Sequence, residues 1–309
     1  VISNLFSEIV GIWLVSTWEK IGKPKIFNFV ELGPGDGSLT KVIISTLKKF
    51  PELNKAIKIY LYEKSVFLKK LQKQNIDNKR IKWIKNFSSI KKGPVIFFGN
   101  EFFDAIPIKQ FSNINNELFE KYYSVKNKIN IIEKFIKSDE KDMTQIKKFE
   151  TLKKLKFIEF PKKGFLELNP IIKKINKLSG GILLIDYGYL NENNSNTIQA
   201  VMDNKKISTE TMLKNLGKAD ITSLVNFNLL KEYFLKNKLK VKKIVTQRFF
   251  LERMGIIERA QILQKKRTNK EQKYMKETLS RLLEEKQMGS LFKVIFGYKN
   301  KNNNFFGFE

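Results

Sequence analysis

The chain of 309 residues contains no cysteine and no histidine. The absence of cysteine excludes disulfides, thiolate zinc sites and a cysteine nucleophile. The absence of histidine argues against a zinc hydrolase and against a serine–histidine triad. Any acid–base chemistry must therefore use carboxylates, lysine, tyrosine or ordered water.

Long hydrophobic runs are also absent. No stretch of 18 apolar residues occurs, so we expect no membrane span. The apolar segment Ile9–Val15 is short and no basic region precedes it, so we expect no signal peptide. Hydrophobic residues make up 42% of the chain and aromatic residues 12%, which predicts a globular protein with one large domain or two.

Acidic residues are much less numerous than basic residues. The chain has 59 Lys and Arg against 31 Asp and Glu, a formal charge of +28. One interpretation is a nucleic-acid-binding face. The lysines, however, occur as scattered doublets such as Lys48-Lys49 and Lys242-Lys243, with no block of five or six like charges. A basic surface that follows from overall composition is the favoured interpretation, and we expect no nucleic-acid partner.

Apolar runs alternate with amphipathic segments in the first hundred residues. The near-continuous apolar character of Ile26–Leu32 is typical of a parallel strand covered on both faces. Residues 2–21 show the spacing of a helix with one buried face, and Ser38 and Ser65 begin two further helical segments, the first capped by Ser38. This alternation predicts an α/β fold with an open parallel sheet, whose ligands bind beyond the carboxyl ends of the strands. The predicted strands are Ile26–Leu32, Ile57–Tyr62, Ile81–Ile84 and Pro94–Gly99.

The pattern changes after Pro107. Residues 108–134 contain strand-like runs separated by polar turns at Asn113–Asn116 and Lys126–Lys128. These runs predict an antiparallel hairpin or meander inserted into the sheet domain.

Both kinds of element continue to the end of the chain. We predict helices over residues 138–155, 165–178 and 226–237 (the last capped by Asn226), two amphipathic helices over 249–287, and strands over Gly181–Asp186, 239–246 and Phe292–Tyr298. The domains expected from this order are a sheet domain of residues 1–110, 165–248 and 288–309, an inserted β/α segment of 111–164 and a helical insertion of 249–287.

A glycine-rich turn follows the first predicted strand, in the stretch FNFVELGPGDGSL that runs from Phe27 to Leu39. Its glycines are Gly33, Gly35 and Gly37, whereas a dinucleotide fingerprint would place the third glycine at position 38. The tighter spacing favours a nucleoside ligand that has no pyrophosphate, such as S-adenosylmethionine (SAM). The alternative is a turn that only connects a strand to a helix.

Two acidic residues stand at strand ends. Glu63 follows the second strand, where a carboxylate can accept hydrogen bonds from both ribose hydroxyls; the alternative is a solvated carboxylate beside Lys64. Glu31 ends the first strand, where it can lie near the cationic part of SAM or orient the turn. The alternative for Glu31 is a structural hydrogen bond within the loop.

The third motif, GNEFFDAIP, occupies residues 99–107 and follows the fourth strand. Glu101 and Asp104 are three residues apart, so a helical turn would place both carboxylates on one side. A pair of carboxylates suits a cationic acceptor such as a guanidinium group, which it can hold in a bidentate manner. The alternative is a helix N-terminus with favourably placed acidic residues.

The stretches GNEFFDAIPIKQF and FVELGPGDGSL together closely resemble the MidA-like SAM-dependent methyltransferases, a family that includes a mitochondrial protein arginine methyltransferase of complex I assembly. Similar stretches occur along nearly the whole chain: GGILLIDYGY at 180–189, TIQAVMDNK at 197–205, GKADITSLVNF at 217–227, TQRFFLERMGIIER at 246–259 and MGSLFKVI at 288–295.

The resemblance implies a class I methyltransferase fold, Rossmann-like, with a mostly parallel seven-stranded sheet and inserted β-hairpin and helical elements. It implies that SAM is the cofactor, with Asn100 and Glu101 near the transferred methyl group. Asp186 and Tyr187 would line the acceptor side, and Glu101, Asp104 and Asp186 would be the catalytic carboxylates. The cofactor-binding residues expected are Glu31, Gly33, Gly35, Gly37, Glu63, Asn86, Asn100 and Glu101.

The function that the resemblance implies is methyl transfer to a protein arginine nitrogen, with a role in assembly of respiratory complex I and a complex I subunit as the protein substrate. The implied location is the bacterial cytoplasm, or the mitochondrial matrix for a eukaryotic source. Two alternatives are a non-catalytic SAM-binding assembly factor and an RNA methyltransferase. Asp36 stands where the family usually has a basic residue, and family chains extend further at the N-terminus, which indicates a fragment or a diverged member.

Overall fold

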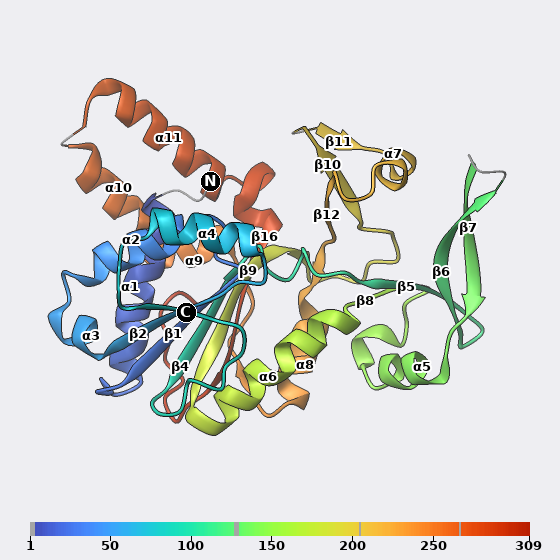
Figure 1. The fold of residues 1–309 in the computed structure, drawn as a ribbon, viewed down its shortest axis with the longest axis horizontal. Helices are drawn as coiled ribbons and strands as arrows, with labels where there is room; N and C mark the ends of the chain where they lie inside the picture. Colours follow the sequence, from blue (N-terminus) through green and yellow to red (C-terminus); the bar gives the residue numbers. More distant parts are fainter. Residues whose placement is uncertain (1–3, 127–129, 204, 266) are drawn as a thin grey trace. The chain divides into compact units, whose positions relative to one another are not determined.

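The computed structural model describes residues 4–126, 130–203, 205–265 and 267–309 (Figure 1). Contacts divide the chain into two compact units. Unit 1 comprises Val1–Phe102, Pro170–Asp186 and Asn237–Glu309, and unit 2 comprises Phe103–Asn169 and Tyr187–Lys236.

A mainly parallel sheet forms the centre of unit 1. Its strand order is β14-β16-β9-β4-β1-β2-β3. Strand β1 pairs in parallel with both β2 and β4, which are labelled beside it in Figure 1. All six residues of β1 are buried, because helices cover both faces of the sheet. The strands are β1 (Phe27–Leu32), β2 (Ile57–Tyr62), β3 (Ile81–Ile84), β4 (Val95–Asn100), β9 (Gly180–Tyr189), β14 (Lys240–Val241), β15 (Val245–Thr246, paired with β16) and β16 (Phe292–Lys299). The predicted α/β fold with a mostly parallel sheet is confirmed.

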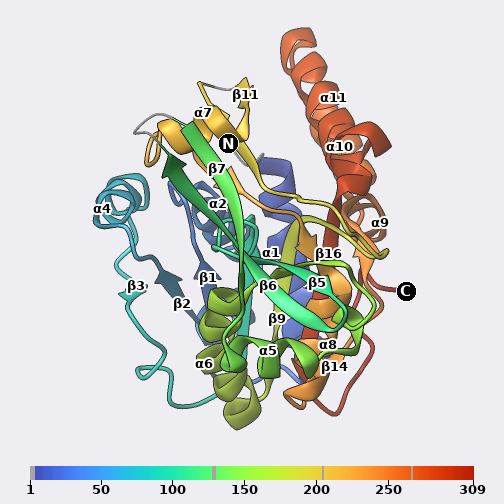
Figure 2. The same ribbon diagram turned by 90° about the vertical axis from the view of Figure 1, so that its right-hand side faces the viewer.

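The helices of unit 1 pack on this sheet and on one another. Helix α1 lies against α2, and a Cβ at Gly11 would approach Thr46 Cγ2 to 3.1 Å, so a small residue permits the close crossing. Arg259 Nε of α10 donates to Glu8 Oε2 of α1 at 2.6 Å. Helices α10 and α11 form a hairpin that is clear in Figures 1 and 2. The helices are α1 (Asn4–Lys20), α2 (Ser38–Leu47), α3 (Pro51–Ala56), α4 (Val66–Asn75), α9 (Gln247–Arg253), α10 (Ile256–Gln264), α11 (Asn269–Leu283), the π-helical turn η2 (Glu285–Gly289) and the second half of α6 (Lys162–Leu178).

Aromatic side chains close the core of unit 1 at its C-terminal end. Phe296 of β16 contacts Trp13 edge-on, with 5.2 Å between ring centroids, and contacts Phe305 at 5.0 Å. Phe250 and Phe308 add to the same cluster at 5.5 Å from each other. The last residues of the chain therefore hold α1, α9 and β16 together.

Unit 2 contains two small antiparallel sheets. One has the order β7-β6-β5-β8 and the other β11-β10-β12, so the predicted meander over 108–134 is confirmed as β5, β6 and β7. Two residues of the predicted turn at Lys126–Lys128 lie outside the described part of the chain. The elements are β5 (Lys109–Ile114), β6 (Glu117–Lys126), β7 (Asn130–Lys137), α5 (Glu140–Lys147), the 3-10 turn η1 (Glu150–Leu152), β8 (Phe157–Phe160), β10 (Gln199–Met202), β11 (Lys205–Ile207), α7 (Thr209–Lys214), β12 (Asp220–Thr222), β13 (Val225–Asn226), α8 (Phe227–Lys236) and the first half of α6.

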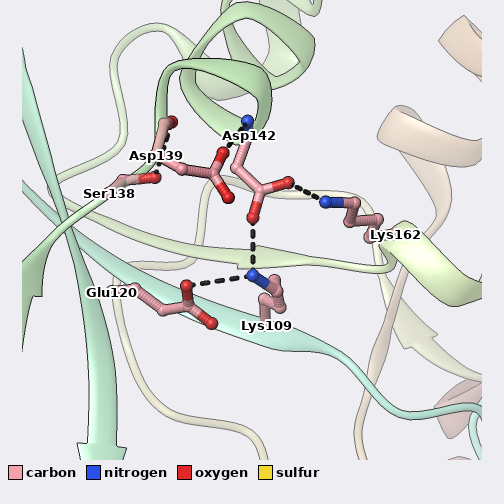
Figure 3. Close-up of polar contacts among 6 residues, drawn as sticks. All are labelled: Lys109, Glu120, Ser138, Asp139, Asp142 and Lys162. Carbon is pink, nitrogen blue, oxygen red and sulfur yellow. Dashed lines mark hydrogen bonds and ion pairs between the residues drawn. The ribbon is translucent and has the colours of Figure 1, made fainter.

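An ion cluster joins four elements of unit 2 (Figure 3). The fully buried side chain of Asp142 accepts hydrogen bonds from Lys109 Nζ at 2.6 Å and from Lys162 Nζ, and Lys109 also donates to Glu120 Oε2 at 2.9 Å. Burial works to lower the pKa of Lys109, but its hydrogen bonds to Asp142 and Glu120 outweigh burial and raise that pKa above its usual range. Two cations and two anions thus link β5, β6, α5 and α6.

Some predicted elements differ from the structure. Ser38 is the first residue of α2 rather than its cap; the cap position is Gly37 (φ +84°), and Asp36 Oδ1 accepts from the Ser38 N–H at 2.9 Å. Residues 239–246 form two short strands instead of one, and residues 249–287 contain parts of three helices instead of two, because Gly255 (φ +80°) separates α9 from α10. The cap of α8 is confirmed, since Asn226 Oδ1 accepts from the Leu229 N–H at 3.0 Å.

The division into units groups residues 187–236 with unit 2, whereas the sequence placed them in the sheet domain. Residues 111–164 fall in unit 2 and residues 249–287 in unit 1. The partition into one methyltransferase domain with two insertions stays a prediction.

Candidate functional site

The carboxyl ends of the neighbouring strands β1, β2 and β4 meet at one edge of the unit 1 sheet. Leu32 at the end of β1 lies opposite Tyr62 on β2 and Gly99 on β4. Asn100 at the end of β4 lies opposite Ile185 on β9. The segments that carry the predicted residues of unit 1 therefore follow adjacent strands at a single edge, where open α/β sheets bind their ligands.

Each glycine of the turn after β1 has positive φ, at +61°, +54° and +84° for Gly33, Gly35 and Gly37. Close neighbours restrict two of them: a Cβ at Gly37 would lie 2.6 Å from Ile76 Cδ1, and one at Gly33 would lie 3.3 Å from Phe102 Cδ2. Gly35 is different, because a Cβ there would meet nothing within 4 Å. The side of Gly35 on which a Cβ would stand is therefore open, so a nucleoside can approach the backbone there and the turn fits SAM.

The glycine turn and the segment after β4 are close to each other, because a Cβ at Gly33 would lie 3.3 Å from Phe102 Cδ2. The Gly33 N–H also donates to the Tyr62 carbonyl at 3.1 Å, which ties the turn to the end of β2. The two motifs that the sequence singled out separately are thus neighbours in the fold.

Glu63 is half-buried after β2, and both of its oxygens are held. Oε1 accepts from the Ser65 N–H at 2.7 Å and Oε2 accepts from Gln72 Nε2 at 3.2 Å. Each oxygen retains a lone pair for another donor such as a ribose hydroxyl.

Helix α4 contributes two site residues that the sequence analysis missed. Gln72, which is fully buried, donates to the Gly35 carbonyl at 2.8 Å, and Asn75 Nδ2 donates to the Asp36 carbonyl at 3.0 Å. Gln72 and Asn75 are one helical turn apart, so α4 holds the two consecutive carbonyls of Gly35 and Asp36 in the glycine turn. Their i, i+3 spacing in a lysine-rich helix was the only sequence signal.

Glu31 is buried at the end of β1, and Thr40 Oγ1 of α2 donates to its Oε2 atom. Burial raises the pKa of Glu31 from 4.5 to about 7; the hydrogen bond from Thr40 opposes this rise and the charge of Asp36 adds to it. A carboxyl group at this position therefore changes its protonation state near neutral pH.

A tight turn after β4 presents Asn100 and Glu101. Glu101 adopts φ +49°, which is uncommon for a residue with a side chain, and it is exposed. Its N–H donates to the Ile185 carbonyl at 3.0 Å, and Asn100 Nδ2 donates to its Oε1 atom at 3.2 Å. The next N–H, that of Phe102, donates to Oδ2 of the fully buried Asp186 at 3.3 Å.

The helical spacing expected for Glu101 and Asp104 is not found. Residues 101–106 form bends and a turn, because the positive φ of Glu101 is incompatible with a right-handed helix. Asp104 belongs to unit 2, where it is buried and its carbonyl accepts from the Ser223 N–H at 3.1 Å. Asn86, after β3, is exposed and its Oδ1 atom accepts from the Ser88 N–H at 3.0 Å, which stabilises its own loop.

A parallel sheet with a glycine turn after its first strand and an acidic residue after its second is typical of α/β proteins that bind a nucleoside-containing cofactor at this edge. Residues 9–245 match the family described as "Putative S-adenosyl-L-methionine-dependent methyltransferase". Because the match covers most of the chain, the chain belongs to this family, and the predicted resemblance and cofactor are confirmed.

Named relatives and solved structures agree with this membership. The chain is 26% identical over 317 residues to "Protein arginine methyltransferase NDUFAF7, mitochondrial" of Xenopus laevis (94% of this chain and 71% of that one). It is 28% identical to the homolog of that protein in Caenorhabditis elegans (95% and 72%). A crystal structure from Burkholderia thailandensis, of a protein bound to S-adenosyl-homocysteine, has a TM-score of 0.79 at 16% identity (99% and 79%) and supports the fold. No helix within the described residues is long and apolar enough to cross a membrane.

Proposed function

We propose that this methyltransferase transfers a methyl group from SAM to an arginine nitrogen of a protein substrate. The observation that carries the proposal is the turn after β4, which presents the exposed carboxylate of Glu101 next to Phe102, whose ring lies close to Gly33 of the glycine turn. The relatives named protein arginine methyltransferases, which match over most of the chain, support the same acceptor.

The cofactor residues are proposed from the edge of the sheet described above. Gly33, Gly35 and Gly37 form the turn that the nucleoside approaches, and Glu63 accepts hydrogen bonds from the ribose hydroxyls. Glu31, Asn86, Asn100 and Glu101 complete the predicted set. SAM supplies an electrophilic methyl group on a sulfonium.

The acceptor chemistry depends on alignment more than on a strong base. A free guanidinium has a pKa above 12, so its nitrogens are poor nucleophiles while the charge stays delocalised. The Glu101 carboxylate orients the guanidinium, localises its positive charge on one side and receives the proton that the nucleophilic nitrogen loses as it gains the methyl group. Asp186 holds the backbone of the turn that carries Glu101, and the role of Asp104 as a second carboxylate stays a prediction.

We propose a subunit of respiratory complex I as the protein substrate, which follows from the family resemblance, and the cytoplasm or mitochondrial matrix as the location. The first alternative, a SAM-binding factor without activity, keeps the glycine turn and Glu63 but needs no exposed Glu101. The second, an RNA methyltransferase, predicts RNA binding that falls steeply with salt concentration.

The test incubates the protein with SAM labelled in its methyl group and an extract of the source cells. Labelled protein, hydrolysed to labelled methylarginine, is the result expected. The Glu101→Gln variant is the matched control: it should still bind SAM in calorimetry and should lose labelling. Label in RNA, or SAM binding with no labelled product, would replace the proposal by one of the two alternatives.

A further inference from the structure

We propose that Gln72 is a positioning residue that makes recognition of the ribose hydroxyls possible, by fixing Glu63 relative to the glycine turn. This inference rests on the proposed role of Glu63 as the ribose-binding carboxylate. Gln72 belongs to α4, which lies outside all the motifs that the sequence analysis singled out.

Three hydrogen bonds use both N–H donors and the oxygen of the Gln72 amide. Its Nε2 atom donates to the Gly35 carbonyl at 2.8 Å and to Glu63 Oε2 at 3.2 Å. Its Oε1 atom accepts from Trp83 Nε1 at 3.0 Å. The side chain is fully buried, so water does not compete for these bonds. One amide therefore connects the glycine turn, the acidic residue after β2 and strand β3.

The chemistry of the partners allows only one orientation of this amide. A carbonyl and an ionised carboxylate accept hydrogen bonds only, and an indole N–H donates only. If the amide were turned over, its oxygen would face two acceptors and its NH2 group would face the Trp83 N–H. Trp83 and the two acceptors thus fix the orientation of Gln72, and Gln72 in turn holds the Oε2 end of the Glu63 carboxylate.

Loss of the bond to Glu63 lowers affinity for the ribose, whereas loss of the bond to the Gly35 carbonyl lowers affinity for the whole cofactor. The second oxygen of Glu63 is held by the Ser65 N–H at 2.7 Å, so with Gln72 in place the carboxylate has both ends fixed. Without Gln72 the Oε2 end is released, and the carboxylate must be ordered again each time a ribose binds. Ordering a mobile side chain on binding lowers affinity.

The experiment measures binding by calorimetry with two probes, S-adenosyl-homocysteine and its 2′,3′-dideoxy analogue. The wild-type protein should bind the first more tightly, and the ratio of the two affinities reports ribose recognition. In Gln72→Met, which has similar volume and no hydrogen bonds, the affinity for S-adenosyl-homocysteine should fall about tenfold. Affinity for the dideoxy analogue should fall much less, so the ratio should collapse.

Asn75→Ala is the matched control, because Asn75 holds the Asp36 carbonyl from the same helix and no hydrogen bond to Glu63 is found for it in the described part of the chain. This variant should lower the affinity for both probes by the same factor, so the ratio of the two affinities should stay unchanged. Trp83→Phe removes the N–H that donates to Gln72 Oε1 and should reduce the ratio of the two affinities partly. If Gln72→Met does not fold, this second variant tests the inference.

Two outcomes separate the inference from the proposed function. If the wild-type protein bound both probes equally, the role of Glu63 in ribose binding would be wrong. If the wild-type protein discriminated and folded Gln72→Met and Trp83→Phe variants discriminated as strongly, Gln72 would be a structural residue only and the inference would be overturned.

Discussion

The backbone N–H of Phe102 donates a hydrogen bond of 3.3 Å to Oδ2 of Asp186, a residue 84 positions later in the chain. This bond and the one from the Glu101 N–H to the Ile185 carbonyl fasten the turn after β4 to β9. The conformation of the turn is therefore set by a neighbouring strand, and the position of the exposed Glu101 side chain depends on a buried carboxylate.

Replacement of Asp186 by alanine should loosen this turn. The Phe102 N–H would lose its acceptor, so we expect the free energy of unfolding to fall by about 1–3 kcal/mol. We also expect methyl transfer to fall more than SAM affinity does, because alignment of Glu101 is lost while the glycine turn stays intact. Denaturation, calorimetry and turnover with labelled SAM measure the three quantities. Asp186→Asn keeps an acceptor oxygen and should be milder; equal turnover of the alanine variant and the wild type would contradict the anchoring role.

Glu101 occupies a left-handed conformation that glycine adopts without cost. Because φ is +49°, Glu101→Gly should raise the free energy of unfolding by about 1 kcal/mol while turnover is lost. Glu101→Gln should keep wild-type stability, since it keeps the side-chain length and the strained backbone. Thermal unfolding and the labelled-methyl assay on both variants test this pairing of strain with function. A glycine variant less stable than the wild type would show that the side chain stabilises the turn.

Glu31 makes stability depend on pH near neutrality. The folded protein retains a proton on this carboxyl up to a pKa of about 7, whereas an unfolded chain releases it near 4.5. A raised folded-state pKa means that the stabilising contribution is complete below pH 4.5 and is lost as the pH rises through 7, a change of about 3 kcal/mol.

Denaturant titrations at pH 5, 6.5 and 8 measure this effect in protein without cofactor. Glu31→Gln cannot titrate and retains an oxygen for the Thr40 hydroxyl, so its stability should change less between pH 5 and 8 and exceed that of the wild type at pH 8. If wild type and variant lost stability in parallel, Glu31 would not be the group responsible.

For the ion cluster of unit 2 we expect the opposite pH dependence: stability should fall as the pH is lowered. Burial works to raise the pKa of Asp142, but hydrogen bonds from Lys109 and Lys162 outweigh burial and lower that pKa below its usual 3.8. The contribution of Asp142 is therefore present at neutral pH and is lost as the pH falls through its lowered pKa. Acid unfolding of the wild type should be steeper than that of Asp142→Asn.

At pH 7, Asp142→Asn should lower the free energy of unfolding by about 2–3 kcal/mol. This is less than for a fully buried pair, because the Lys109 and Lys162 side chains are 32% and 31% exposed. Glu120→Gln, which weakens only the contact to Lys109, is the control and should lower the free energy of unfolding by less. An Asp142→Asn variant as stable as the wild type at pH 7 would show that the cluster contributes nothing.

The sequence predicted those elements that have a recognisable local pattern of apolar residues or glycines. The buried strands β1 and β4 are continuous apolar runs, and Gly33, Gly35 and Gly37 occur at the strand end where positive φ is required. Glu63 was predicted at the edge of the sheet because a parallel strand ends just before it. Spacing failed for Glu101 and Asp104, because a single residue with positive φ breaks the helical period on which that interpretation relied.

The sequence by itself thus determined the α/β order, the glycine turn and the acidic residues that follow the strands, since apolar periodicity and backbone freedom are local properties. Only the tertiary structure decided which polar residues hold the site. Gln72 and Trp83 are separated by 11 positions and Thr40 and Glu31 by 9, and each pair meets because a helix packs against the sheet. A buried hydrogen bond requires two partners that meet where water is excluded. These partners lie in different segments of the chain, so the pattern of either segment alone does not predict the bond.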